Sequence, residues 1–194
     1  MTVVYNRIAL IGLGLIASSM FWSIRKGNLA QEVVGFAKSK KTRDTAKSIG
    51  LCDHVFNNLK DTVNNADLVV LCTPVGVMGE VVEQIAPYLK KGATLSDVGS
   101  VKRAVLDAVE PLIPQDVCFV PAHPLAGTEH SGPESGFSSL FENRWCILVP
   151  TTSSTRNAVE KLTRLWTGMG ALVDQMDADH HDLVLAVTSH APHL

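Results

Sequence analysis

The sequence predicts an α/β protein with a doubly wound, mostly parallel sheet. Short runs rich in Val, Ile and Leu alternate with longer stretches whose apolar residues have helical spacing. Continuous apolar strands separated by helices are typical of a parallel sheet that is covered on both faces. The chain has 194 residues, of which 46% are hydrophobic and 19% charged, so it is long enough to bury a core and too apolar to be disordered.

The expected elements follow one another along the whole chain. Strand-like runs occupy residues 7–11, 33–37, 67–73, 94–97, 117–122, 145–150 and 171–175. Helical spacing marks residues 16–26, 41–49, 78–89, 101–109 and 156–169. Residues 121–141 form a polar stretch rich in Gly, Pro and Ser, and loops of this length in compact domains are usually functional or disordered. Because ligands bind beyond the carboxyl ends of parallel strands, we expect chemistry in this stretch.

Charge and composition exclude several classes of protein. The formal net charge is −2, so no nucleic-acid partner is expected, because such proteins cluster positive charge. No apolar run reaches the roughly 18–20 residues that a membrane span needs, and the N-terminus lacks the layout of a signal peptide. The four cysteines form no C-x-x-C pair, which argues against a zinc knuckle or a disulfide framework. We expect a soluble cytoplasmic protein without a membrane partner.

A glycine-rich turn predicts a dinucleotide site. Residues 12–17 match the pattern G-x-G-x-x-G/A and lie between the first expected strand and the first expected helix. Gly12 allows a tight turn, Gly14 lets the backbone approach a pyrophosphate, and the helix that opens at Leu15 and Ile16 presents its N–H groups to the phosphates. The alternative is a merely structural turn, but the position of the motif favours a Rossmann-type nucleotide domain.

The end of the second expected strand bears on the choice of dinucleotide. A carboxylate usually stands there to hold a ribose 2′-hydroxyl. Here the strand ends in Ala37, Lys38 and Ser39, and more basic residues follow. Cations suit a 2′-phosphate, so the sequence mildly favours NADP while NAD stays open. The alternative interpretation is a solvated basic first turn of a helix.

Three further motifs stand near strand ends. They are D-V-G-S-V-K at 97–102, H-P-L-A-G-T-E at 123–129 and S-H-A-P-H at 189–193. Together with the glycine motif, and in this order, they resemble the prephenate/arogenate dehydrogenase family (the cyclohexadienyl dehydrogenases of tyrosine biosynthesis) over essentially the whole chain. The resemblance implies oxidative decarboxylation of prephenate to 4-hydroxyphenylpyruvate, or of arogenate to tyrosine, with NAD or NADP as the hydride acceptor.

The resemblance also implies roles for single residues. His123 would bind the ring hydroxyl and accept its proton as hydride leaves, a task that suits a neutral imidazole. Ser100 would hydrogen-bond the same hydroxyl, although a serine at this position is also a candidate helix N-cap. Thr73 and Pro74 resemble the turn beside the cofactor ribose and nicotinamide. The residues that match positions around the substrate are Thr128, Glu129, Ser189, His190 and His193.

No metal site is expected, although the last part of the chain is rich in potential ligands. His190 and His193 have a chelating spacing, but Pro192 interrupts a helix between them and no third ligand has a fixed spacing. Asp177 and Asp179 are more simply explained as acidic residues at a helix start. The cluster also includes His180, His181 and Asp182.

The resemblance implies a division of the chain. Residues 1–176 would form the nucleotide-binding domain, and residues 177–194 would begin a helical domain that forms a homodimer and completes the substrate pocket. Two other functions stay open. A β-hydroxyacid dehydrogenase of the 6-phosphogluconate type shares the first domain, although the H-P-L-A-G-T-E loop argues against it. The other, for these 194 residues taken alone, is an NAD(P)-binding module or sensor without catalysis, and for them we expect cofactor binding with little or no turnover.

Overall fold

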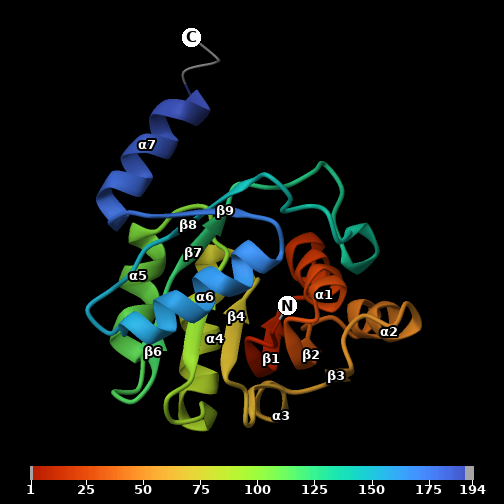
Figure 1. Cartoon of the computed structure of the whole chain (residues 1–194). Helices are drawn as coiled ribbons and strands as arrows, with labels where there is room; N and C mark the ends of the chain where they lie inside the picture. Colours follow the sequence, from red (N-terminus) through yellow and green to blue (C-terminus); the bar gives the residue numbers. More distant parts are fainter. Residues whose placement is uncertain (1, 191–194) are drawn as a thin grey trace.

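A six-stranded parallel sheet forms the centre of the molecule (Figure 1). The computed structural model describes residues 2–190, with side chains described up to residue 187. The strand order is β3-β2-β1-β4-β5-β6, in which two β-α-β halves meet between β1 and β4. The strands are β1 (Tyr5–Ile11), β2 (Ala30–Phe36), β3 (His54–Phe56), β4 (Leu68–Leu71), β5 (Thr94–Asp97) and β6 (Cys118–Phe119).

Helices cover both faces of this sheet, so the buried parts of its central strands are mostly apolar. Ile8 and Leu10 of β1 belong to one buried cluster, whereas Ala9 and Ile11 belong to the other. The first cluster includes side chains of α1 (Leu15–Gly27) and α6 (Arg156–Gly168), and the second includes side chains of α4 (Met78–Ile85) and α5 (Arg103–Val109). The predicted α/β class is confirmed. The other helices are α2 (Lys40–Ser48), α3 (Leu59–Val63), α7 (Ala178–His190), η1 (Val75–Val77), η2 (Ala86–Tyr88), η3 (Glu110–Leu112) and η4 (Pro133–Ser135).

The strand expected over residues 117–122 is in fact two strands. After β6 the chain turns at Pro121, which has no N–H to donate, and continues as β7 (Ala122–Pro124). β7 pairs antiparallel with β8 (Trp145–Leu148), which in turn pairs parallel with β9 (Leu172–Gln175). The last two predicted strands therefore form a separate three-stranded sheet with β7, and His123 lies opposite Ile147 in it.

Some element boundaries differ from the expected ones for local reasons. α4 ends at Ile85 because Pro87 follows, and the chain continues as η2. α5 begins at Arg103, so Ser100 is not its N-cap, contrary to the alternative weighed above. The sequence pattern missed β3 and α3, which have three and five residues and offer too short a period to recognise. Within residues 2–190, no helix combines the length and apolar character that crossing a membrane requires.

The long polar loop between β7 and β8 runs along helix α1. The backbone N–H of Phe137 donates to Ser19 Oγ (3.2 Å), and Ser23 Oγ donates to the carbonyl of Ser138 (2.8 Å). At Gly136 the loop passes so near that an added Cβ would lie 2.7 Å from the carbonyl carbon of Ser18. Figure 1 shows the loop, in teal, reaching across to α1 and α2. The loop thus connects the His123 strand with the helix that follows the glycine motif.

Candidate active site

The residues predicted to bind a nucleotide meet at one edge of the main sheet. Gly12 follows β1, Ala37 follows β2 and Thr73 follows β4, and these three strands are neighbours. The N–H of Gly12 donates to the carbonyl of Phe36 (2.8 Å), which ties the ends of β1 and β2 together. The N–H of Cys72 likewise donates to the carbonyl of Ile11 (2.7 Å), which joins β1 to β4.

The geometry at this edge fits a dinucleotide. Gly12 has φ +96°, and a Cβ there would lie 2.7 Å from the carbonyl oxygen of Cys72, so the position requires glycine. Helix α1 follows Gly14, and its first turn begins with Leu15 and Ile16. No side chain caps this end and its first turn has no acidic residue, so the positive end of the helix dipole is open to an anion. The hydroxyl of Thr73 is buried without a hydrogen-bond partner in the protein, as expected of a group that a ligand satisfies.

The end of β2 is basic and locally ordered. Ala37 is buried and Lys38 is exposed. Ser39 caps α2, since its Oγ accepts from the N–H of Thr42 (3.4 Å). The guanidinium of Arg43 donates to the carbonyls of Ala37 (2.7 Å) and Lys38 (2.8 Å), so a fixed cation lies beside the strand end.

A pocket of about 400 Å³ lies where β5, β7 and α7 approach one another, and its volume is in the usual range for small-molecule sites. Ser100 and His123, the two predicted catalytic residues, both line it. Ser100 is exposed in the turn after β5, and His123 is partly buried on β7. The structure therefore brings these two side chains together. The other described residues of the lining are Val101, Leu125, Asp182, Leu185 and Ala186.

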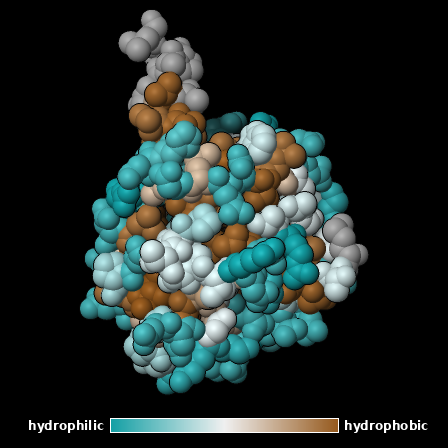
Figure 2. Space-filling model, turned by 60° about the vertical axis from the view of Figure 1, so that its left-hand side comes forward, coloured by the Kyte–Doolittle hydropathy of each residue, from teal (hydrophilic) through white to brown (hydrophobic). Residues whose placement is uncertain are grey.

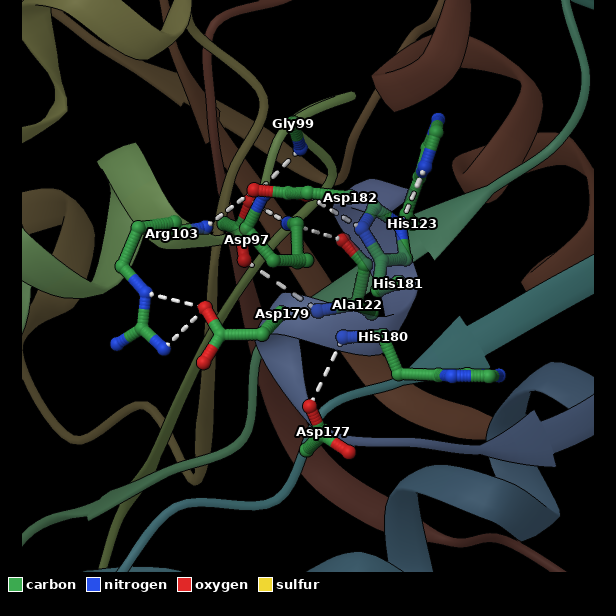
Figure 3. A network of polar contacts seen from close by, with 11 residues as sticks. Asp97, Gly99, Arg103, Ala122, His123, Asp177, Asp179, His180, His181 and Asp182 are labelled. Carbon is green, nitrogen blue, oxygen red and sulfur yellow. Dashed lines mark hydrogen bonds and ion pairs between the residues drawn. The ribbon is translucent and has the colours of Figure 1, made fainter. Parts of the chain in front are cut away.

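His123 is the outermost member of a row of hydrogen-bonding groups (Figure 3). Its Nδ1 lies 2.9 Å from Nε2 of His181, and Nδ1 of His181 lies 2.7 Å from Oδ1 of Asp182. The His181 ring is completely buried. Asp182 also accepts the backbone N–H groups of Lys102 (2.8 Å) and Arg103 (2.9 Å), and so takes the place of a cap at the start of α5.

The surroundings keep His123 uncharged at neutral pH. Burial, followed by the nearby charge of Lys102 and by His181, lowers the pKa of His123 from 6.5 to about 4, although Asp182 acts in the opposite direction. A neutral imidazole has one nitrogen that can accept a proton.

A buried ion pair lies beneath His123. Lys102 Nζ donates to Asp97 Oδ2 (2.5 Å) and to the carbonyl of Ala122 (2.8 Å), and neither charged side chain has any exposed surface. Asp97 also accepts the N–H groups of Gly99 (2.7 Å) and Ala122 (3.3 Å). Burial raises the pKa of Asp97 and lowers that of Lys102, while their attraction opposes both shifts. The pair fixes the Ser100 turn to the strand of His123.

Several predicted substrate residues do not line this pocket within the described part of the chain. Thr128 and Glu129 are exposed in the loop, where Thr128 Oγ1 accepts the N–H of His130 and Glu129 lies 3.6 Å from the ring of His130. Pro74 is exposed at the start of η1. Ser189 and His190 end α7, but their side chains are not among those described, and His193 lies outside the described residues.

The candidate metal ligands near the end of the chain have other tasks in the structure. Asp177 Oδ1 accepts the N–H of His180, as an acidic residue at a helix start does. His180 is exposed, whereas His181 faces His123. Among the described side chains, no three or more of His, Cys, Asp and Glu are arranged to hold a metal ion.

Sequence reasoning assigned no role in the site to Asp97, Lys102, His181 or Asp182. The sequence did contain a signal for Asp97 and Lys102, because they place two opposite charges at the end of an apolar strand, inside the D-V-G-S-V-K motif. The pairing of His181 with His123 joins residues 58 positions apart and depends on α7 meeting β7, which no local pattern indicates.

The strand order and the glycine turn at Gly12 define a Rossmann-type dinucleotide-binding domain. A model of the family described as prephenate dehydrogenase, nucleotide-binding domain, matches residues 22–175. The chain belongs to this family, as the sequence motifs predicted. The match includes the D-V-G-S-V-K and H-P-L-A-G-T-E motifs and begins after the glycine motif.

Relatives of this chain are longer than it is. It is 41% identical over 191 residues to the cyclohexadienyl dehydrogenase of Zymomonas mobilis, covering 98% of this chain and 65% of the relative. It is 33% identical over 190 residues to the prephenate dehydrogenase of Bacillus subtilis, covering 97% and 51%. The chain thus spans about half to two thirds of the length of these relatives.

Solved structures of related enzymes have the same architecture. Prephenate dehydrogenase from A. aeolicus, in complex with hydroxyphenyl propionate and NAD+, superimposes with a TM-score of 0.88 at 29% identity over 97% of this chain and 65% of that one. Arogenate dehydrogenase from Synechocystis superimposes with a TM-score of 0.88 at 27% identity, covering 96% and 65%.

Proposed function

We propose that this chain binds NAD(P) and takes part in the oxidative decarboxylation of prephenate, arogenate or both. The observation that carries the proposal is the neutral His123 in the pocket beside Ser100, at the same end of the sheet as the glycine turn. Family membership and the names of the relatives support it.

Each residue of the pocket has a task in this proposal. The bound nicotinamide would take a hydride from the carbon that bears the ring hydroxyl, and loss of carbon dioxide makes the ring aromatic. His123 accepts the hydroxyl proton at Nε2. The Ser100 hydroxyl orients the same oxygen. Val101, Leu125 and Leu185 form apolar walls, which keep water from the reacting atoms.

We also propose that the nucleotide residues act as the sequence predicted, with NADP preferred over NAD. Gly12, Gly14 and the first turn of α1 would hold the pyrophosphate, and Thr73 and Pro74 would face the ribose and nicotinamide. Exposed Lys38, together with the fixed guanidinium of Arg43, favours a 2′-phosphate, and Ser39 adds a hydroxyl. The A. aeolicus relative was crystallised with NAD+, so NAD is the competing outcome.

The outer residues of the loop and of α7 are proposed to complete the substrate site. Thr128 and Glu129 of the exposed loop, together with Ser189, His190 and His193, would contact the substrate. These roles come from the family resemblance. They predict that variants of these residues raise KM for the substrate more than KM for the cofactor.

We propose a homodimer as the assembled form, with α7 beginning a second domain near residue 177. Figure 1 shows α7 projecting from the body, and Figure 2 shows hydrophobic side chains gathered at its base and on the face below it. Leu183 and Val187 of this helix are exposed, at 64% and 59%. Exposed apolar patches mark association surfaces. Sedimentation velocity of the chain and of its Leu183→Glu variant measures whether each forms a dimer. If the unmodified chain is a monomer at all concentrations, the proposed homodimer is contradicted.

A steady-state assay tests the function. In a protein that also contains the complete helical domain expected from residue 177 onward, we expect reduction of NADP+ or NAD+ that depends on added prephenate or arogenate. The reaction is followed by the absorbance of the reduced nicotinamide and yields an aromatic product with release of carbon dioxide. Cofactor titration by fluorescence runs in parallel. Binding of the cofactor without any turnover of either substrate favours the non-catalytic nucleotide-binding module instead.

A further inference from the structure

We propose that His181 and Asp182 are positioning residues that hold His123 in the tautomer with its proton on Nδ1 and with Nε2 free to accept one. The catalytic consequence depends on the proposed function, whereas the tautomer itself does not. Neither residue was expected in this role from the sequence.

The direction of the hydrogen bonds follows from the end of the row. An ionised carboxylate only accepts, so Asp182 Oδ1 requires the proton of the 2.7 Å contact to sit on Nδ1 of His181. A neutral His181 then has an acceptor at Nε2, and this atom faces Nδ1 of His123 at 2.9 Å. His123 must therefore donate from Nδ1. Its Nε2 remains unprotonated, and Figure 3 shows this nitrogen on the side of the ring away from His181.

Asp182 is itself held in place, which makes the arrangement rigid. Its two carboxylate oxygens accept the N–H groups of Lys102 and Arg103 at 2.8 and 2.9 Å, and such bonds fix both its position and its charge. Those bonds lower the pKa of Asp182, against the effect of burial. The same carboxylate therefore secures the start of α5, beside the Ser100 turn, and orients His181. His181, with its ring fully buried, has no room to turn away.

The opposite arrangement makes a distinct prediction. If His181 were charged, both of its nitrogens would donate, and His123 Nδ1 would have to accept from it. A neutral His123 would then carry its proton on Nε2 and would be unable to act as a base there. The same distances therefore allow two chemical states, which ring nitrogen signals distinguish.

Nitrogen-15 NMR of the labelled chain at neutral pH measures the tautomers directly. We expect long-range proton–nitrogen correlations to show a protonated Nδ1 and an unprotonated Nε2 in both His123 and His181. In His181→Leu, His123 loses its acceptor, and a mixture of tautomers is expected. In His181→Gln, the side-chain oxygen can still accept from His123, so the Nδ1 form is retained. His180→Gln, an exposed histidine on the same turn, is the matched control and leaves the signals of His123 unchanged.

Asp182→Ala tests the second residue. We expect the preference of His181 for a protonated Nδ1 to be lost, because its acceptor is gone. A His123 protonated on Nε2 in the unmodified chain overturns the proposal. So does a His123 that keeps its Nδ1 proton in His181→Leu while the variant remains folded by circular dichroism.

Turnover measurements test the catalytic consequence. Losing the hydrogen-bond partner of a metal-ligating histidine lowers activity by roughly 10–100-fold, and we expect an effect of that order for the partner of His123. We expect kcat of His181→Leu to fall in this range with KM for the cofactor unchanged, and kcat of His181→Gln to stay within a few-fold of the unmodified protein. Equal losses in the two variants indicate a merely structural role and overturn the positioning. These turnover measurements use a protein that contains the complete helical domain. Absence of prephenate and arogenate turnover in its unmodified form counts against the proposed function alone, because the NMR result stands without it.

Discussion

The acid–base behaviour of His123 results from neighbours that act in opposite directions. Burial, the charge of Lys102 and the ring of His181 favour the neutral imidazole, while Asp182 favours the charged one. The first three prevail, so His123 enters the reaction with a nitrogen able to accept a proton. Its place at a strand end, in the H-P-L-A-G-T-E motif, is visible in the sequence. The neighbours that set its charge are not, because they come from the start of α5 and from α7.

Replacement of His123 by alanine tests its place in the reaction. We expect kcat to fall by at least about 10²-fold, as for a lost general base, while the dissociation constant of the cofactor stays the same. The assay is substrate-dependent reduction of NAD(P)+ by a protein that contains the complete helical domain, combined with fluorescence titration of the cofactor. His180→Ala, on the exposed side of α7, serves as the control. Near-normal turnover in His123→Ala removes this residue from the mechanism.

The end of β2 offers a test of cofactor choice at a single position. Ala37→Asp places a carboxylate beside the expected ribose, where it repels a 2′-phosphate and accepts from a 2′-hydroxyl. Since hydrogen bonds to charged groups contribute about 1.5–3 kcal/mol, we expect the ratio of the two dissociation constants to shift toward NAD by roughly tenfold or more. Isothermal titration with both cofactors measures it. Ala108→Asp, on the exposed side of α5, controls for the added charge, and a clear NAD preference in the unmodified chain contradicts the prediction.

Contacts between elements determine how the local motifs become one site. The sequence predicted Gly12, Ser100 and His123 because each lies in a short pattern next to a strand end. It did not predict the break at Pro121, after which β7 belongs to the second sheet, and it did not predict that α7 approaches β7. Both depend on pairing with segments more than twenty residues away, namely β8 and His181. A residue pattern encodes the period of an element but not the partner that it packs against.

The contact between the long loop and α1 is testable through one glycine. In Gly136→Ala the new Cβ would lie 2.7 Å from the backbone carbonyl carbon of Ser18, which cannot move without distorting α1. We expect a loss of about 1–3 kcal/mol in the free energy of unfolding, as for other overpacked positions. Urea denaturation measures it. Gly127→Ala in the same loop is the matched control, because no atom lies within 4 Å of the added Cβ, and a change within about 0.5 kcal/mol is expected there. Equal effects of the two substitutions would show that the loop does not rest on α1.

Over the whole molecule, the fold class was predictable and the strand order was not. Alternating apolar runs and helical stretches indicate a parallel sheet covered on both faces, and the two buried clusters confirm this. The order β3-β2-β1-β4-β5-β6 depends on which crossover passes over which face. β3 and α3 are too short to leave a period in the sequence. The burial of Asp97 and Lys102 was not predictable from the sequence either, since only the assembled fold shows that their side chains have no exposed surface.

Because the fold encloses His123 in its neutral form, the stability of the whole molecule should depend on pH below neutrality. The pKa of His123 is about 4 in the folded chain against 6.5 for the free side chain, so between these values the unfolded state binds more protons than the folded state. The free energy of unfolding therefore falls as pH is lowered from about 6.5 toward 4. The full contribution of the neutral His123 to this free energy is present only above about pH 6.5. The carboxyls of Asp67 and Asp182, whose pKa values are lowered, lose their contributions only at lower pH.

Urea denaturation at pH 7 and pH 5 isolates this effect from that of the carboxyls. We expect the unmodified chain to lose about 1–2 kcal/mol more between these two pH values than His123→Gln does, a range that allows for the partial exposure of the ring. Glutamine has a similar size and does not titrate, so its difference from the unmodified chain reports the ionisation of His123. His180→Gln makes the same substitution at an exposed position of α7 and serves as the matched control. If the unmodified chain and His123→Gln lose the same free energy between pH 7 and pH 5, then His123 is not held neutral by the fold, and its proposed readiness to accept a proton at neutral pH has no basis in its burial.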